Sequence, residues 1–163
     1  MKRTQGGFSL IELLIVVAII LIIAAIAIPN FLRSRISANE SSAVASIRQI
    51  TTAEISYSIS FPTVGYADSL TKLGPTSPPG GLPTPAAADL LGQDLGCPGA
   101  PCKKSGYQFT LNGVAGTPVV DVSVFAVPQV LYMSGNRGFC SDHMGPIMYD
   151  PAGATACTIP IPQ

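Results

Sequence analysis

The N-terminal part of the chain carries its strongest hydrophobic pattern. No polar residue occurs in positions 13–28, and the only polar residues that interrupt the apolar run before them are Ser9 and Glu12. As an α-helix the whole segment from Phe8 to Ile28 would measure about 30 Å, which is the thickness of the hydrocarbon core of a bilayer. The pattern therefore predicts a membrane-spanning helix over residues 8–29, with one carboxylate close to its start.

An amphipathic pattern follows over residues 30–61, which contain neither Gly nor Pro. We expect these residues to continue the same helix, to bury one face under a globular domain, and to end before Pro62. Pro29 lacks an N–H group and crowds the carbonyl of Ala25, so the helix should kink or loosen there. The apolar positions at helical spacing are Ala43, Ile47, Ile50, Tyr57 and Phe61.

The rest of the chain changes from irregular to β-rich. We expect a loop over residues 62–105, because 13 of the 28 residues in 74–101 are Gly or Pro. Within this loop a helical turn is expected in 66–73 and a short helix in 86–91. Residues 106–163 predict an antiparallel sheet of three or four strands, which makes the fold α+β, a long helix packed on a small sheet. The expected strands are 107–111, 119–127, 138–142 and 146–149.

Four cysteines lie in the C-terminal two thirds of the chain, at Cys97, Cys102, Cys140 and Cys157. Outside a reducing compartment they would form disulfides, and three pairings are open. We favour Cys97 with Cys102 and Cys140 with Cys157, because near neighbours in sequence lose little entropy when they are joined. The spacing fits a zinc site poorly, so no metal is expected.

The net charge and the absence of catalytic motifs argue against nucleic-acid binding and enzymatic activity. The chain has nine basic and nine acidic side chains, and its formal net charge of zero gives no sign of a basic surface for nucleic acid. The sequence has no phosphate-binding or nucleophile motif, and its one histidine, His143, has no nucleophile marked beside it. We therefore expect no catalytic residue, no cofactor and no enzymatic activity.

Small residues precede the apolar run instead of following it, which is unlike an ordinary secretory signal. A short basic leader ends at Gly6 and Gly7, and Phe8-Ser-Leu-Ile-Glu12 comes next. This arrangement resembles the class III leader and N-terminus of type IV pilins, which type II secretion pseudopilins share. The resemblance covers about residues 1–36. It implies that prepilin peptidase removes residues 1–7 by cutting between Gly7 and Phe8, and that Phe8 is then N-methylated.

The resemblance also implies what the chain does. It describes a structural subunit that is held in the inner membrane by one span as a precursor and is then assembled into an extracellular pilus for adhesion, motility or DNA uptake. Its partners would be the peptidase, the assembly machinery and further copies of itself in a helical filament. The implied assembly residues are Phe8, Glu12 and Pro29: the Glu12 carboxylate would pair with the Phe8 amine of a neighbouring copy, and the helix would locally melt around Pro29 in the filament. The loop closed by Cys140 and Cys157 would be exposed on the fibre.

Two other functions stay open at this point. A type II secretion pseudopilin would form a short periplasmic pseudopilus, but major pseudopilins usually carry an acidic calcium-binding loop near the C-terminus. Residues 140–163 contain only Asp142 and Asp150 as acids, which makes calcium binding unexpected and favours the pilin. A single-pass anchored protein of another kind would not explain the combination of Gly7, Phe8 and Glu12.

Overall fold

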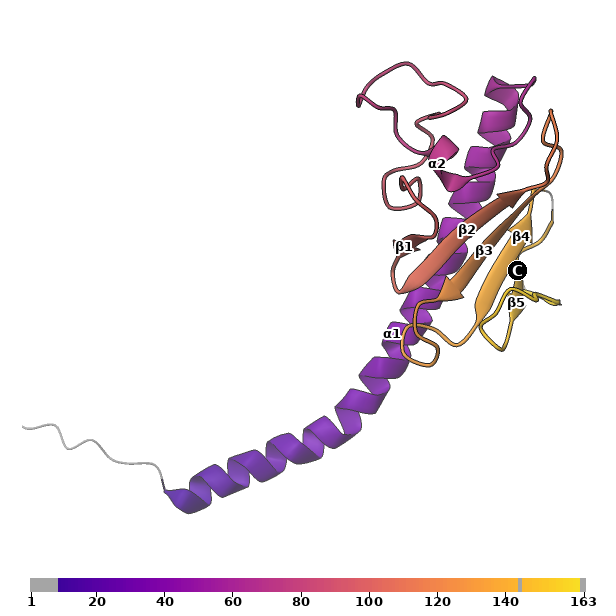
Figure 1. Ribbon diagram of the computed structural model, residues 1–163. Coiled ribbons are helices and arrows are strands. Elements are labelled where there is room, and N and C mark those ends of the chain that lie inside the picture. The colour runs from indigo at the N-terminus through magenta and orange to yellow at the C-terminus, as the bar shows by residue number, and fades with distance from the viewer. Residues whose placement is uncertain (1–8, 144, 162–163) are drawn as a thin grey trace, which may run out of the picture. The chain divides into compact units, whose positions relative to one another are not determined.

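The structure, a computed structural model, describes residues 9–143 and 145–161. The chain divides into two compact units, residues 1–35 and 36–163. The division falls inside one long helix, α1, which spans Leu10–Ser60 (Figure 1). The sequence prediction of a single helix across both hydrophobic patterns is therefore confirmed.

The first part of α1 is apolar and exposed. Its most apolar 18-residue window has a mean hydropathy of 3.3, and this is the one helix in the described residues that is long and apolar enough to cross a membrane. Pro29 lies inside α1, which is helical on both sides of it. Next to Pro29 the side-chain amide of Asn30 donates a hydrogen bond of 3.1 Å to the carbonyl of Ile26.

The second part of α1 forms one wall of the core of residues 36–163. The predicted apolar stripe is buried except at Phe61, which is only partly buried. Burial of a large aliphatic or aromatic side chain stabilises the folded state by about 1.5–3 kcal/mol, so this stripe fixes which face of the helix meets the sheet. The buried members of the stripe are Ala43, Ile47, Ile50 and Tyr57.

A six-stranded antiparallel sheet lies against this part of α1, with its strands in the order of the sequence (Figure 1). In β2 and β3 buried and partly exposed residues alternate, as expected for a sheet with one face on the core. Their register places Phe109 opposite Ala126, and both are buried. The strands are β1 Cys102–Lys104, β2 Tyr107–Gly113, β3 Val122–Pro128, β4 Gly138–Asp142, β5 Met148–Asp150 and β6 Ile159–Pro160.

The expected number of three or four strands was too low. The two strands that the sequence did not reveal, β1 and β6, are three and two residues long. An alternating pattern needs about four residues before it can be recognised. The predicted strand 119–127 also begins later, at Val122, because Val119 pairs with Gly65 in an isolated bridge.

The segment between α1 and β1 contains one short helix, α2, at Leu70–Leu73, inside the expected range of 66–73. The short helix expected at 86–91 is absent from the described structure. Asp89 has a φ of 54° there, which lies outside the right-handed helical region. The backbone N–H groups of Leu90 and Leu91 donate to the carbonyl of Leu73 at 3.0 and 2.8 Å. The segment therefore binds α2 instead of forming a helix of its own.

Candidate assembly site

Glu12 lies in the first turn of α1 and is exposed. Its neighbours are apolar side chains that are also exposed, at 77% for Leu10, 65% for Ile11 and 60% for Leu13. A carboxylate near a helix N-terminus interacts favourably with the helix dipole. Glu12 is the only acid in residues 9–35, so it is the one negative side chain of this segment that is available to a positively charged partner.

The processing residues cannot be placed beside Glu12, since Gly7 and Phe8 lie outside the described residues. The surface that follows them is described. The large hydrophobic residues between Leu10 and Leu32 are at least 45% exposed, the lowest value being that of Val17. A contiguous apolar surface of this length is unfavourable in water and indicates contact with lipid or with other protein chains.

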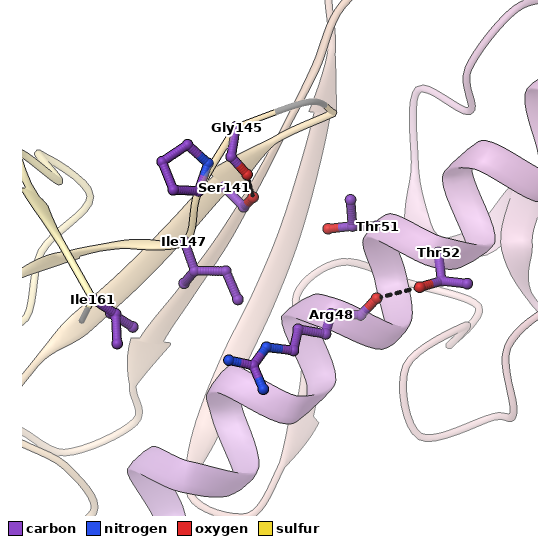
Figure 2. A pocket seen from close by; sticks show the side chains of 8 residues that line it. Arg48, Thr51, Thr52, Ser141, Gly145, Ile147 and Ile161 are labelled. Atoms are coloured by element: carbon purple, nitrogen blue, oxygen red, sulfur yellow. Dashed lines mark hydrogen bonds between the residues drawn. The ribbon is translucent and has the colours of Figure 1, made fainter. Parts of the chain in front are cut away.

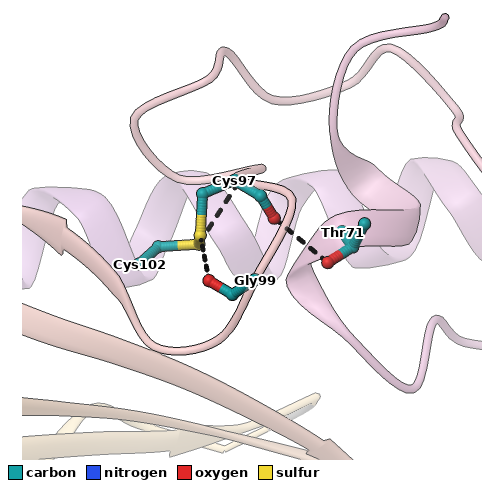
Figure 3. Close-up of a disulfide and its surroundings, with 4 residues drawn as sticks. All are labelled: Thr71, Cys97, Gly99 and Cys102. Carbon is teal, nitrogen blue, oxygen red and sulfur yellow. Dashed lines mark hydrogen bonds between the residues drawn. A yellow bond between two sulfur atoms is a disulfide. The ribbon is translucent and has the colours of Figure 1, made fainter.

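Both predicted cysteine pairs are joined in the structure, with sulfur–sulfur distances of 1.98 Å for Cys97–Cys102 and 2.00 Å for Cys140–Cys157. Figure 3 shows the first pair beside α2, where the Thr71 hydroxyl donates a hydrogen bond of 3.0 Å to the carbonyl of Cys97. This disulfide therefore closes the irregular segment directly before β1. The second joins β4 to the chain between β5 and β6.

A second acid of α1, Glu40, ties the loop between β3 and β4 to the helix. Its Oε1 accepts the backbone N–H groups of Asn136 and Arg137 at 2.9 and 3.3 Å, and its Oε2 accepts Nε and Nη2 of Arg137 at 2.9 and 2.6 Å. The Glu40 side chain is 9% exposed. The guanidinium also lies 5.7 Å from the ring centre of Phe139 and 5.3 Å from that of Tyr149. The charge of Glu40 is therefore neutralised within the chain.

A third acid of α1, Glu54, is fully buried. Its Oε2 accepts the backbone N–H of Ala67 at 2.8 Å, whereas Oε1 has no hydrogen-bond partner among the described residues. Burial raises the pKa of Glu54 to about 8, the Ala67 hydrogen bond opposes that shift, and the nearby charge of Asp68 adds to it. Asp68 itself has a lowered pKa, mainly because of its hydrogen bond with Lys72. Glu54 is thus a protonated acid at neutral pH.

Glu40 and Glu54 are not among the site residues that the sequence predicts. The spacing contained a signal for Glu54, because residue 54 continues the stripe at 47, 50 and 57. No spacing in the sequence identifies Glu40, since its partner Arg137 is 97 residues away.

A groove of about 410 Å³ lies between α1 and the C-terminal strands (Figure 2). Arg48 is the only titratable side chain among the residues that line it. The other lining residues are small, hydroxyl-bearing or aliphatic, and they are Thr51, Thr52, Ser141, Gly145, Pro146, Ile147 and Ile161.

His143 lies 3.0 Å from the Asp121 carboxylate through Nδ1, and its ring is 5.0 Å from that of Tyr66. In the described residues no group of three or more His, Cys, Asp or Glu side chains is placed to hold a metal ion.

Comparison with known proteins identifies the N-terminal segment. Residues 2–28 match the family described as the prokaryotic N-terminal methylation motif. The chain is 51% identical over 51 residues to the type IV major pilin protein PilA of Myxococcus xanthus, which covers 31% of this chain and 23% of that protein. It is 60% identical over 38 residues to the type IV wide pilus major component PilA4 of Thermus thermophilus, which covers 23% of this chain and 29% of that protein.

The chain therefore aligns with about a quarter of the length of these curated relatives. No solved structure matches it. The resemblance to type IV pilins is confirmed for the N-terminal segment, and the long helix, antiparallel sheet and C-terminal disulfide agree with the α+β fold that this resemblance implied.

Proposed function

We propose that this chain is a pilin, the structural subunit of a type IV pilus, and that it assembles by packing the first part of α1 against the same segment of other copies. The observation that carries this proposal is the exposed apolar surface from Leu10 to Leu32, which follows a methylation motif and has a single carboxylate in its first turn. In the precursor this surface contacts lipid, and in the filament it contacts other copies.

The processing proposed for this subunit follows the sequence motif. Prepilin peptidase removes residues 1–7 by cleaving between Gly7 and Phe8, and the new amine of Phe8 is methylated. In the growing filament this amine pairs with the Glu12 carboxylate of a neighbouring copy. The pair removes two opposite charges from an apolar environment, where each would be costly alone. A copy that docks out of register leaves both charges unpaired, so the pair sets the register of assembly.

The remaining segments take the roles of a pilin subunit. Residues 8–29 form the membrane and filament-core helix, in which Pro29 is a point of local melting on assembly. Residues 30–61 support the globular part. Residues 62–105 form the connecting loop, which ends in strand β1, and residues 106–163 form the other five strands of the sheet with its C-terminal disulfide. The precursor resides in the inner membrane and the assembled subunit on the cell surface. The subunit is structural and has no enzymatic activity, metal or cofactor in this proposal, and it recognises no specific nucleic acid.

The pilin function is favoured over that of a type II secretion pseudopilin. The curated relatives of the N-terminal segment are a type IV major pilin and a wide pilus major component. In addition, Cys140–Cys157 closes the C-terminal region, and residues 140–163 carry only two acids, Asp142 and Asp150, where a major pseudopilin usually has an acidic calcium-binding loop.

An intact-mass spectrum of filaments sheared from the cell surface tests this function. We expect a dominant species that begins at methylated Phe8 and has all four cysteines oxidised. A processed chain that is absent from the sheared fraction and stays in the envelope would favour the pseudopilin. A chain that still begins at Met1 would contradict the proposed processing.

A further inference from the structure

Four consecutive apolar residues, 130–133, lie in the loop between β3 and β4. Leu131 is the least exposed of them at 38%, and its Cδ1 lies against Gly153. The other three side chains face solvent and are here called the loop cluster: Val130 at 52%, Tyr132 at 73% and Met133 at 73% exposed. Exposed apolar side chains that are contiguous mark contact surfaces more often than scattered ones do.

The loop that carries this cluster is held in one conformation by both α1 and the sheet. The side-chain amide of Asn39 donates to the carbonyl of Ser134 at 2.9 Å, and Glu40 accepts the backbone of Asn136 at 2.9 Å. The hydroxyl of Tyr107 donates to the carbonyl of Arg137 at 2.8 Å. Tyr132 has a φ of 65°, which is unfavourable for a residue with a side chain. The loop therefore presents its apolar side chains in a preorganised form, which lowers the entropy lost on binding.

A second exposed apolar group lies at the other end of residues 36–163. It is here called the helix-end cluster and consists of Val114 at 55% and Val120 at 66% exposed. These two side chains belong to neighbouring segments, because the Val114 N–H donates to the carbonyl of Asp121 at 2.9 Å. The chain around Val120 is fixed just beyond the end of α1, because Tyr66 N–H donates to the carbonyl of Val119 at 3.0 Å. With a rise of about 1.5 Å per residue, the 20 residues of α1 from Glu40 to its end at Ser60 separate the two clusters by about 30 Å.

The charges beside the two clusters are of opposite sign. Lys103 and Lys104 precede the turn at Gly106, whose carbonyl accepts the backbone N–H of Gln129 at 2.9 Å at the base of the loop cluster. Within the part of the chain that the structure describes, neither lysine forms an ion pair. At the other end Asp121 follows Val120 directly, and its carboxylate lies 3.0 Å from Nδ1 of His143 but is still 53% exposed.

We propose that the loop cluster of one copy packs against the helix-end cluster of a second copy of this chain, with Lys104 of the first near Asp121 of the second. The inference rests on the proposed pilin function and adds to it a contact between globular parts. The two clusters are different surfaces, so each copy keeps one free end after the contact forms. A contact of this kind extends into a fibre unless rotation closes it into a ring.

Cross-linking within intact filaments tests the contact. All four native cysteines are paired in the structure, so a full-length chain with Met133→Cys and Val120→Cys presents two new thiols, which a short bismaleimide can join. A matched chain carries Met133→Cys and Leu82→Cys, because Leu82 is 89% exposed and belongs to neither cluster. We expect a ladder of covalent multimers above the dimer from the first chain and no ladder from the second.

Reversing the charges of Lys104 and Asp121 tests the same contact in a second way. In the Met133→Cys, Val120→Cys background, Lys104→Glu should lower the cross-linking yield several-fold at low salt, and adding Asp121→Lys should restore it. Filaments that form normally but give no ladder above the control, or a yield that does not respond to the charge swap, would overturn the inference and leave the pilin function standing.

If the cysteine chains do not assemble, a photoreactive benzoylphenylalanine in place of Tyr132 retains the aromatic bulk and decides the question. Cross-links from this position to residues 114–121 of another copy support the contact. Cross-links that map elsewhere contradict it. An unsubstituted chain that forms no filaments on cells would contradict the pilin function, and with it this inference.

Discussion

Glu54 makes the stability of the globular part depend on pH in an unusual direction. Its carboxyl group is fully buried and has a pKa of about 8, against a reference value of 4.5. Between these two values the unfolded chain ionises Glu54 while the folded chain keeps the proton. The contribution of Glu54 to stability is therefore complete below pH 4.5, falls as the pH rises to about 8, and stays constant above that.

The size of this effect follows from the difference between the two pKa values. One pKa unit corresponds to about 1.4 kcal/mol, so the difference of about 8 minus 4.5 corresponds to about 5 kcal/mol. The whole stability of a domain is about 5–15 kcal/mol. Two titratable side chains interact electrostatically with Glu54. The charge of Asp68 raises the pKa of Glu54 further. The pKa of Tyr57 is raised by burial, by Asp68 and by Glu54 itself.

The substitution Glu54→Gln removes the titration and keeps an oxygen that accepts the Ala67 N–H. Its amide nitrogen takes the place of Oε1, which has no partner in the described structure, so we expect a cost of about 1–3 kcal/mol at every pH. The variant should therefore be no more stable than the parent chain at pH 4.5 and more stable than it at pH 8, by about 2–4 kcal/mol.

Urea unfolding of the full chain in detergent micelles measures this, with tyrosine fluorescence as the signal because the chain has no tryptophan. Asp89→Asn is the matched control, because it makes the same change of carboxylate to amide at an exposed loop position with a φ of 54°, which Asn tolerates. The control should follow the parent curve from pH 4.5 to 9. A difference between Glu54→Gln and the parent chain that stays constant with pH would refute the reasoning.

Three further predictions concern other side chains of the same fold. Glu12→Gln should leave leader removal intact by mass spectrometry and abolish filaments by electron microscopy, and normal piliation would contradict the assembly role of Glu12. Arg137→Met should destabilise the globular part by about 3–5 kcal/mol in urea unfolding, because it leaves the Glu40 carboxylate buried without its ion-pair partner, and a loss below about 1 kcal/mol would show that this pair is unimportant. Replacing both Cys97 and Cys102 by Ser should lower stability by about 2–4 kcal/mol and expose the segment before β1 to proteases, and an unchanged digestion pattern would show that the disulfide does not hold that segment.

The helix and the central strands could be predicted because their signals are local. The apolar run and the stripe that includes Ile47 and Ile50 lie within α1, and the alternation in β2 and β3 lies within seven residues of chain each. Where the sequence reasoning was wrong, the deciding contacts came from elsewhere. The helix expected at 86–91 was excluded by backbone hydrogen bonds to Lys72, Leu73 and Gly74, which no property of residues 86–91 reveals.

The three acidic side chains of α1 differ in whether the chain itself compensates their charge. Glu40 is neutralised by Arg137, and Glu54 keeps its proton because burial raises its pKa. Each of these carboxyl groups thus avoids an isolated charge in an apolar environment by means found within the chain. Glu12 is also surrounded by apolar side chains, but it is exposed and is the only acid of residues 9–35. In an apolar filament core its charge would need a cation from another chain, and the methylated amine of Phe8 is the one that the proposed processing creates next to the same helix.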